Sequence, residues 1–178
     1  MSTQPEPEHH AKPRRAKWRA TVINLLLIVA LVAGIRAWQQ RDMVSGAAPL
    51  LRGITLDGDF YNLPGHLDRP LLVHFWATWC GICRAEQGSI QGIARDHQNV
   101  ITIAMQSGKP QEVAAYLQAQ GISFPVLNDE EGRLSQQWGV HAVPASFIID
   151  RAGQIRFVEV GYTTGIGLRL RLWWAGIL

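Results

Sequence analysis

Residues 71–83 read LLVHFWATWCGIC, and the interpretation of the whole chain starts from this stretch. Its first six residues are apolar except for His74, and they have the length and composition of a buried strand. Cys80 and Cys83 follow at the point where the strand is expected to give way to a helix. Because the 178-residue chain has two cysteines in total, no third thiol competes for a disulfide between them.

A cysteine pair at the start of a helix suits thiol redox chemistry. The unpaired N–H groups and the positive dipole of a helix N-terminus favour a thiolate, and they lower a cysteine pKa from about 8.5 into the range of about 3.5–7.5. Cys80 would occupy this position and act as the nucleophile. Cys83, one helical turn later, would face inward and act as the resolving thiol.

Metal binding is the alternative for a CxxC pair, since two cysteines make half of a zinc site. The chain has six histidines, but it contains no second CxxC and no pair of histidines at ligand spacing. We therefore predict no metal and no other cofactor for the main function. Soft thiolates also suit Cu(I), so a copper-binding protein is retained as a second hypothesis.

The N-terminal part of the chain is divided between a basic tail and an apolar run. Residues 1–19 carry five Lys and Arg residues, whereas residues 20–35 read ATVINLLLIVALVAGI without a charge. Trp18 and Trp38 stand where interfacial anchors are expected. We predict a cytoplasmic tail over 1–19, a transmembrane anchor over 20–38, a linker over 39–49 and a folded domain over 50–178.

The excess of basic residues before the apolar run predicts the topology. By the positive-inside rule the N-terminus stays in the cytoplasm, so a single-pass protein of the inner membrane would expose its cysteine domain to the periplasm. A cleaved signal peptide remains the alternative for the same segment.

The net charge of +3 does not indicate nucleic-acid binding. Residues 1–36 hold six basic and two acidic residues, so the remainder carries a net charge of −1. Because no basic patch with interleaved aromatic residues appears in it, we predict no nucleic-acid partner.

Beyond residue 46 the pattern is that of an α/β domain. Short apolar runs on either side of Asp57-Gly58-Asp59 predict a β-hairpin. Apolar residues at helical spacing predict helices elsewhere, and about 130 residues suffice for one core. The predicted strands are 54–56, 60–63, 71–76, 100–105, 124–127, 147–150 and 155–160, and predicted helices follow Cys83, Pro110 and Leu134.

The motifs resemble a known family. FWATWCxxCRxE at residues 75–86, with Val143-Pro144 and the run to Asp150, is similar to the membrane-anchored, extracytoplasmic thioredoxin-like proteins of the TlpA type. The C-terminal tail more closely resembles the suppressor-of-copper-sensitivity ScsD group. The resemblance covers about residues 50–160 and implies a thioredoxin-like fold, with a central mixed sheet flanked by helices. It also implies that Cys80 is the exposed nucleophile and Pro144 a cis proline facing the disulfide.

Four further residues receive roles from their positions. Trp79 is expected on the rim that meets a substrate, and the backbone at Val143 and Pro144 is expected to hold a substrate segment in extended form. His74 occupies the strand position where thioredoxin has a buried aspartate, so we hypothesise that it accepts the proton of Cys83. Glu86 is expected to cap its helix or to pair with Arg84, and a role in the chemistry is the alternative.

These features together predict a membrane-tethered protein thiol:disulfide oxidoreductase. Its expected substrates are periplasmic protein thiols and disulfides, and a membrane electron-transfer partner would serve it. The resemblance connects it with copper tolerance and with proteins of cytochrome c maturation. The alternative function is a periplasmic Cu(I)-binding copper-tolerance protein.

The C-terminal segment 167–174 alternates leucine with arginine and ends in two tryptophans. It is too short to span a membrane. We favour a helix that packs on the sheet with Trp173 or Trp174 in the core, and a segment lying on a membrane surface is the alternative.

Overall fold

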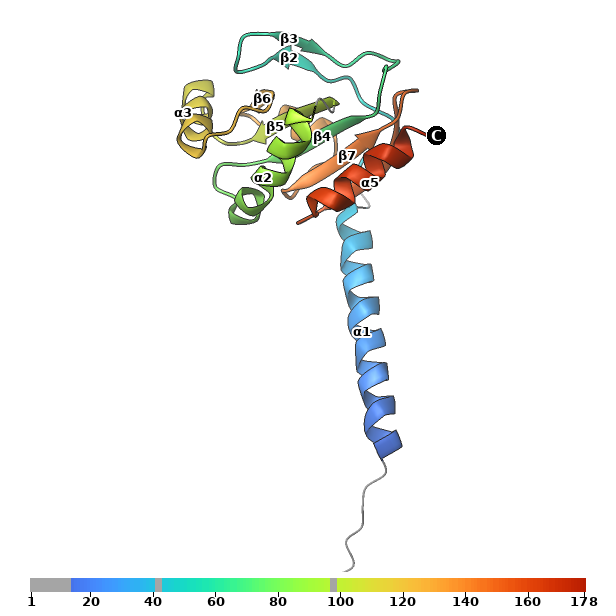
Figure 1. The fold of residues 1–178 in the computed structure, drawn as a ribbon. Coiled ribbons are helices and arrows are strands. Elements are labelled where there is room, and N and C mark those ends of the chain that lie inside the picture. Colours follow the sequence, from blue (N-terminus) through green and yellow to red (C-terminus); the bar gives the residue numbers. More distant parts are fainter. Residues whose placement is uncertain (1–13, 41–42, 97–98) are drawn as a thin grey trace, which may run out of the picture. The chain divides into compact units, whose positions relative to one another are not determined.

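The computed structural model describes residues 14–40, 43–96 and 99–178 (Figure 1). It divides into two compact units, one ending at Trp38 and the other beginning at Gln39. Most of the predicted basic tail, residues 1–13, lies outside the described residues.

The first unit holds helix α1 (Arg14–Gln40) up to Trp38, and this part contains the predicted apolar segment. Apart from the half-buried Val22, its described large apolar side chains are exposed, including Leu25, Leu31 and Ile35. Within the described part of the chain, no helix combines the length and the apolarity needed to cross a membrane.

The second unit is built on a six-stranded mixed sheet in the order β1-β8-β7-β4-β5-β6. Strand β4 pairs in parallel with β5 and antiparallel with β7, so it lies near the centre of the sheet. The strands are β1 (Gly46–Ala47), β4 (Leu71–Trp76), β5 (Asn99–Met105), β6 (Val126–Asp129), β7 (Ala145–Ile149) and β8 (Gln154–Val160). The predicted thioredoxin-like arrangement of a central mixed sheet with flanking helices is confirmed.

Two apolar clusters cover the two faces of the sheet. Side chains alternate along a strand, so Leu72 and Trp76 of β4 face one cluster, whereas Leu71, Val73 and Phe75 face the other. Helices α2 (Gly81–Arg95) and α5 (Gly165–Ala175) contribute to the first cluster and lie side by side over the sheet in Figure 1. The end of β4, from which the CxxC follows, is thereby fixed between two packed layers.

The remaining elements flank this sheet. Strands β2 (Arg52–Ile54) and β3 (Phe60–Asn62) form the predicted hairpin as a separate two-stranded sheet. Helix α3 (Pro110–Gln120) begins at the predicted proline and ends at Gly121, whose φ of 65° belongs to the left-handed region that glycine adopts readily. Helix α4 (Arg133–Gln137) is a single short turn before Trp138.

The folded domain begins earlier than the sequence suggested. Residues 46 and 47, assigned to a linker, form β1 and pair with the edge of β8. Met43 and Val44 pack against the second apolar cluster. Backbone pairing to an edge strand carries no side-chain periodicity over two residues, so the pattern could not reveal it.

Helix α5 confirms one part of the C-terminal prediction and corrects another. Leu168, Leu172 and Ala175 are buried at helical spacing, so the segment packs as a helix on the domain. Trp173 and Trp174 are 64% and 55% exposed, so the expectation of a tryptophan in the core is wrong. At about 100° per residue, the tryptophans point away from the stripe that the three buried residues form.

Candidate active site

Cys80 and Cys83 are joined by a disulfide at the start of α2, with their Cα atoms 5.3 Å apart. Cys80 is the N-cap residue, and its Sγ accepts a hydrogen bond of 3.1 Å from the backbone N–H of Cys83. An N-cap residue normally satisfies one of the free N–H groups with a side-chain oxygen. Here a sulfur atom takes that place, so the helix terminus acts directly on the atom that would carry negative charge.

The two sulfur-bearing residues differ in accessibility. Cys80 is 7% exposed, whereas Cys83 is completely buried. A substrate sulfur can therefore approach Cys80 and not Cys83. A helix N-terminus stabilises a thiolate, and the nucleophile and resolving roles of the pair stay predictions.

The segment Val143-Pro144 lies against the disulfide. Its peptide bond is cis, as the family resemblance implied. The carbonyl oxygen of Val143 is 3.6 Å from Sγ of Cys80, although the two residues are 63 positions apart in the chain. The structure thus brings four of the predicted site residues together: both cysteines, Val143 and Pro144.

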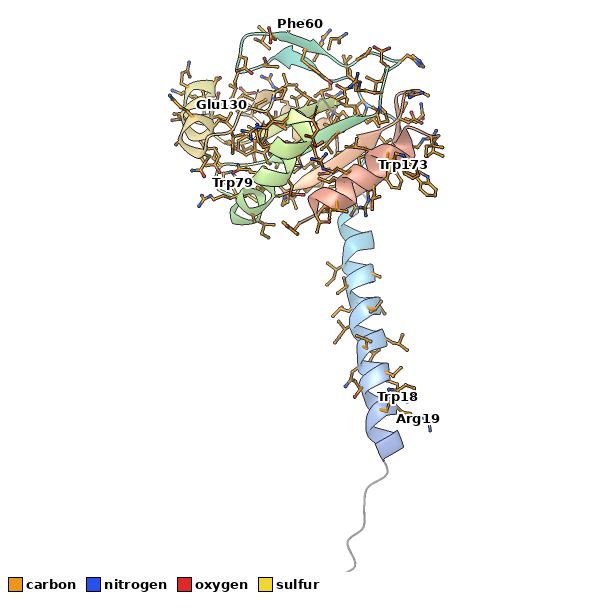
Figure 2. The ribbon with its side chains drawn as sticks, viewed as in Figure 1. Trp18, Arg19, Phe60, Trp79, Glu130 and Trp173 are labelled. Carbon is orange, nitrogen blue, oxygen red and sulfur yellow. A yellow bond between two sulfur atoms is a disulfide. The ribbon has the colours of Figure 1, made fainter. Side chains whose placement is uncertain are left out.

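Trp79 directly precedes Cys80 and lies at the N-terminal start of α2, where Figure 2 labels it. Its side chain is 62% exposed, and its indole N–H donates to the carbonyl of Gln106 over 3.1 Å. The neighbouring Thr78 N–H donates to the Ser107 hydroxyl over 3.0 Å. The loop after β5 therefore positions the segment before Cys80. Nothing in the spacing or polarity of Gln106 and Ser107 points to this role.

His74 is buried in the middle of β4, and the nearest polar group to its ring is a hydroxyl. Its Nδ1 lies 2.9 Å from the hydroxyl oxygen of Ser146, the residue opposite it on β7. Burial lowers the pKa of His74 from 6.5 to about 3. The ring is therefore neutral at physiological pH and is a weak base. This disfavours the hypothesis that it takes the proton of Cys83.

Glu86 is the buried acid of the site. It follows Cys83 by three residues on the same buried side of α2 and has no exposed surface. Its Oε1 accepts a 3.2 Å hydrogen bond from the backbone N–H of Thr163, and its Oε2 has no hydrogen-bond partner. Burial raises the pKa of Glu86 from 4.5 to about 7, against the lowering effect of the Thr163 bond. The expectation of a cap or a pair with Arg84 is wrong.

One signal for Glu86 was visible before folding, since the residue matches the acidic position of the family motif. Its hydrogen-bond partner Thr163 is 77 positions away, in the connection from β8 to α5.

Groups of three or more possible metal-ligating side chains are not found among residues 14–40, 43–96 and 99–178.

The sequence of this chain is similar to those of known thioredoxin-like and thiol:disulfide interchange proteins. Residues 44–158 match the AhpC/TSA family. A thioredoxin-like protein of Haemophilus influenzae is 27% identical over 154 residues, which cover 86% of this chain and 92% of that protein. The thiol:disulfide interchange protein HelX of Rhodobacter capsulatus is 32% identical over 144 residues, covering 75% of this chain and 81% of HelX.

A solved structure shows the same fold. The crystal structure of a thiol:disulfide interchange protein of the thioredoxin family from Chlorobium tepidum covers 75% of this chain and 98% of its own. Its TM-score is 0.64 and its sequence identity is 26%. The names of these relatives confirm the predicted enzyme class, a protein disulfide oxidoreductase, whereas the closer resemblance to the ScsD group stays a prediction. The chain belongs to the AhpC/TSA family, and the match includes both cysteines and the cis proline.

Proposed function

We propose that this protein is a membrane-tethered thiol:disulfide oxidoreductase that acts on periplasmic protein thiols and disulfides. The observation that carries the proposal is the Cys80–Cys83 disulfide at the N-terminus of α2, with the more accessible sulfur facing the Val143 carbonyl. One sulfur is open to a partner and the other is sealed behind it, which is the asymmetry that a two-step exchange needs.

The reaction follows from this asymmetry. In the reducing direction, the Cys80 thiolate attacks a substrate disulfide, the substrate S–S bond breaks, and one substrate thiolate leaves as a mixed disulfide forms. Cys83 then loses its proton and attacks Cys80 Sγ. This step closes the Cys80–Cys83 disulfide and releases the second substrate thiolate. Two electrons have then passed from the enzyme to the substrate, and the reverse sequence oxidises a dithiol.

Glu86 is the group best placed to take the proton of Cys83. The two residues are neighbours at i and i+3 on one helix face, where Cβ atoms are about 5–6 Å apart. An acceptor is most effective when its pKa lies near the working pH, and the pKa of Glu86 is about 7. His74, with a pKa of about 3, lacks this property.

The substrate would meet the rim beside Cys80. Exposed Trp79 offers an apolar surface, and the backbone at Val143 and Pro144 offers groups for an extended segment. Protein segments are thus the expected substrates, in line with the names of the relatives.

Tethering is supported by residues 20–35, which carry no charge. Apart from the half-buried Val22, the described apolar side chains of this segment are exposed, and exposed apolar surface of this extent is unfavourable in water. A bilayer would remove it, with the basic residues on the cytoplasmic side. A membrane electron-transfer partner would then return Cys80 and Cys83 to the redox state needed for the next cycle.

Protease added to spheroplasts should digest the cysteine domain, and release of the intact domain into the periplasmic fraction would contradict the tether.

Single-cysteine variants test the exchange itself. Cys83→Ala should accumulate mixed disulfides with substrate proteins on non-reducing gels, because nothing displaces the bound substrate. Cys80→Ala should form almost none, since Cys83 is completely buried. The reverse pattern would overturn the assignment of the two cysteines.

Copper titration of the reduced protein distinguishes the oxidoreductase from a Cu(I)-binding protein. Tight stoichiometric binding of Cu(I) without insulin reduction would favour the copper-binding protein.

A further inference from the structure

We propose that the outer face of α5 docks on an anionic bilayer surface. We define this face as Ile166, Leu170, Trp173, Trp174 and Ile177. The inference rests on the membrane tether of the proposed function and extends it, because it says which side of the oxidoreductase domain the membrane meets.

The outer face is a second apolar stripe on a helix that already uses one for folding. Its four members within α5 recur at i, i+4, i+7 and i+8, the spacing of one helix face, and Ile177 follows in the turn after the helix. The exposed fractions of all five lie between 55% and 74%. At about 100° per residue, this stripe is centred opposite the buried stripe that holds α5 on the domain. Packing of the domain therefore leaves five large apolar side chains together in water.

Charged side chains border the stripe on both sides. Arg169 pairs with Asp96 over 2.5 Å, and Arg171 pairs with Glu159 over 2.7 Å. By helical rotation, these two arginines lie about 80–120° to either side of the stripe. Long side chains with an apolar stem and a charged end are suited to the boundary between an apolar face and water.

A hollow lies at the C-terminal end of the stripe. It is lined by Arg151 and by Arg169, whose charge is paired with Asp96, together with Trp173 and Ile177. Arg151 is exposed, and none of the ion pairs found among the described residues involves it. Guanidinium groups beside exposed apolar side chains match a surface of anionic head groups over acyl chains.

The two tryptophans are the residues expected at such a boundary. Their rings are 6.4 Å apart and nearly perpendicular, and Trp173 extends from α5 away from the sheet in Figure 2. Tryptophan is enriched at membrane–water interfaces because its ring is apolar and its N–H is polar. The 11 residues of α5 make a helix of about 16 Å, which is too short to span a bilayer and fits an orientation in its plane.

A short connection between α1 and the domain favours a bilayer as the surface that covers the outer face of α5. Two residues separate Gln40, the end of α1, from Met43, which packs on the domain. An extended chain covers at most about 3.6 Å per residue, so a connection of two residues is short. If α1 is inserted, the membrane surface is always within reach of the domain, at a high effective concentration.

Tryptophan quenching in the full-length protein tests the docking. The protein is reconstituted in vesicles of phosphatidylethanolamine and phosphatidylglycerol that contain brominated phosphatidylcholine. Emission quenched by the bromines is compared among the native protein, a Trp173→Phe/Trp174→Phe double variant and a Trp18→Phe variant. Trp79→Phe is the matched control, because Trp79 is equally exposed but lies at the disulfide.

Docking predicts that the double variant loses a clear part of the lipid-quenched emission, whereas Trp79→Phe loses none. Replacing phosphatidylglycerol by a neutral lipid, or Arg151 by Gln, should reduce this part. The proposal is overturned if acrylamide in the water quenches Trp173 and Trp174 and the bromines do not. It is equally overturned if both quenchers fail and protection rises with protein concentration, since a second copy then covers the face. Loss of quenching in Trp18→Phe reports the tether separately, so failure of docking and failure of the tether are distinguished.

Discussion

Replacing Glu86 by Gln removes the one ionisable group buried beside the resolving cysteine and changes little else. The amide keeps an oxygen for the Thr163 N–H, which now donates to Oε1 over 3.2 Å. The substitution also keeps the size of a side chain that has no exposed surface. Any difference between the two proteins that depends on pH then reports the charge of Glu86.

The structure gives both the sign and the size of the stability effect. The pKa of Glu86 is 4.5 ordinarily and about 7 when buried. Below pH 4.5 the folded and unfolded states both hold the proton. As pH rises towards 7, the unfolded chain releases it first, so the native state loses stability relative to Glu86→Gln. At about 1.36 kcal/mol per pH unit, the interval corresponds to an upper bound of roughly 3 kcal/mol.

Urea unfolding of the oxidised proteins across this pH range measures the effect. The free energies of the native protein and Glu86→Gln should run parallel in acid and diverge by about 2–3 kcal/mol between pH 4.5 and 8, the variant being more stable. Glu131→Gln is the matched control, since Glu131 forms an exposed pair with Arg133 and should show no such divergence. Parallel curves for native protein and Glu86→Gln throughout would refute a buried carboxyl with a raised pKa.

The same variant separates the two steps of exchange. In stopped-flow measurements, Glu86→Gln should slow the attack of Cys83 on the mixed disulfide by about 10²-fold or more, as loss of a general base does, and should leave the first attack by Cys80 nearly unchanged. Equal changes in both steps would remove the proton-acceptor role.

Substitutions at His74, on α5 and at Asp150 test other parts of the domain. His74→Leu should leave the pH dependence of resolution unchanged, because the ring is already neutral, while the orphaned Ser146 hydroxyl lowers stability by about 1–2 kcal/mol in urea unfolding. Leu172→Ala should cost about 2–4 kcal/mol by the same measurement, whereas Leu170→Ala, on the exposed side of α5, should stay within about 0.5 kcal/mol. Asp150→Ala should destabilise by about 2–3 kcal/mol at neutral pH, because its carboxylate accepts two backbone N–H groups and a guanidinium. These bonds outweigh burial and lower the pKa of Asp150, so its contribution should be lost as pH falls below about 4, and a constant difference in acid would contradict this account.

The sequence by itself determined the features that depend on near neighbours. Strand β4 is visible as an apolar run, the turn at Asp57-Gly58-Asp59 sets the hairpin, and Gly121 marks the end of α3. Each of these signals depends on backbone preferences or on side-chain periodicity over a few residues. The position of Cys80 and Cys83 at a strand-to-helix junction belongs to the same class, and so does the enzyme class that follows from it.

Only the tertiary structure decided which polar groups surround the disulfide. Glu86 is held by Thr163, Cys80 faces the carbonyl of Val143, and the indole of Trp79 donates to Gln106. These contacts join segments 27 to 77 positions apart, and no local pattern encodes them. Burial then sets the chemistry, since desolvation raises the pKa of Glu86 and lowers that of His74. From the sequence we expected a proton acceptor near Cys83 and favoured His74 for this role. The burial produced by long-range packing favours Glu86 instead.

The C-terminal helix shows the same division. The leucines and tryptophans of residues 168–174 are apolar on every side of a helix, so composition alone cannot say which side faces the domain. In the folded domain Leu168 and Leu172 are buried against the rest of the domain. Because successive residues of a helix are rotated by about 100°, Trp173 and Trp174 are then exposed. The sequence therefore determined that the segment is rich in apolar residues, and the tertiary structure decided which of them are buried and which stay exposed.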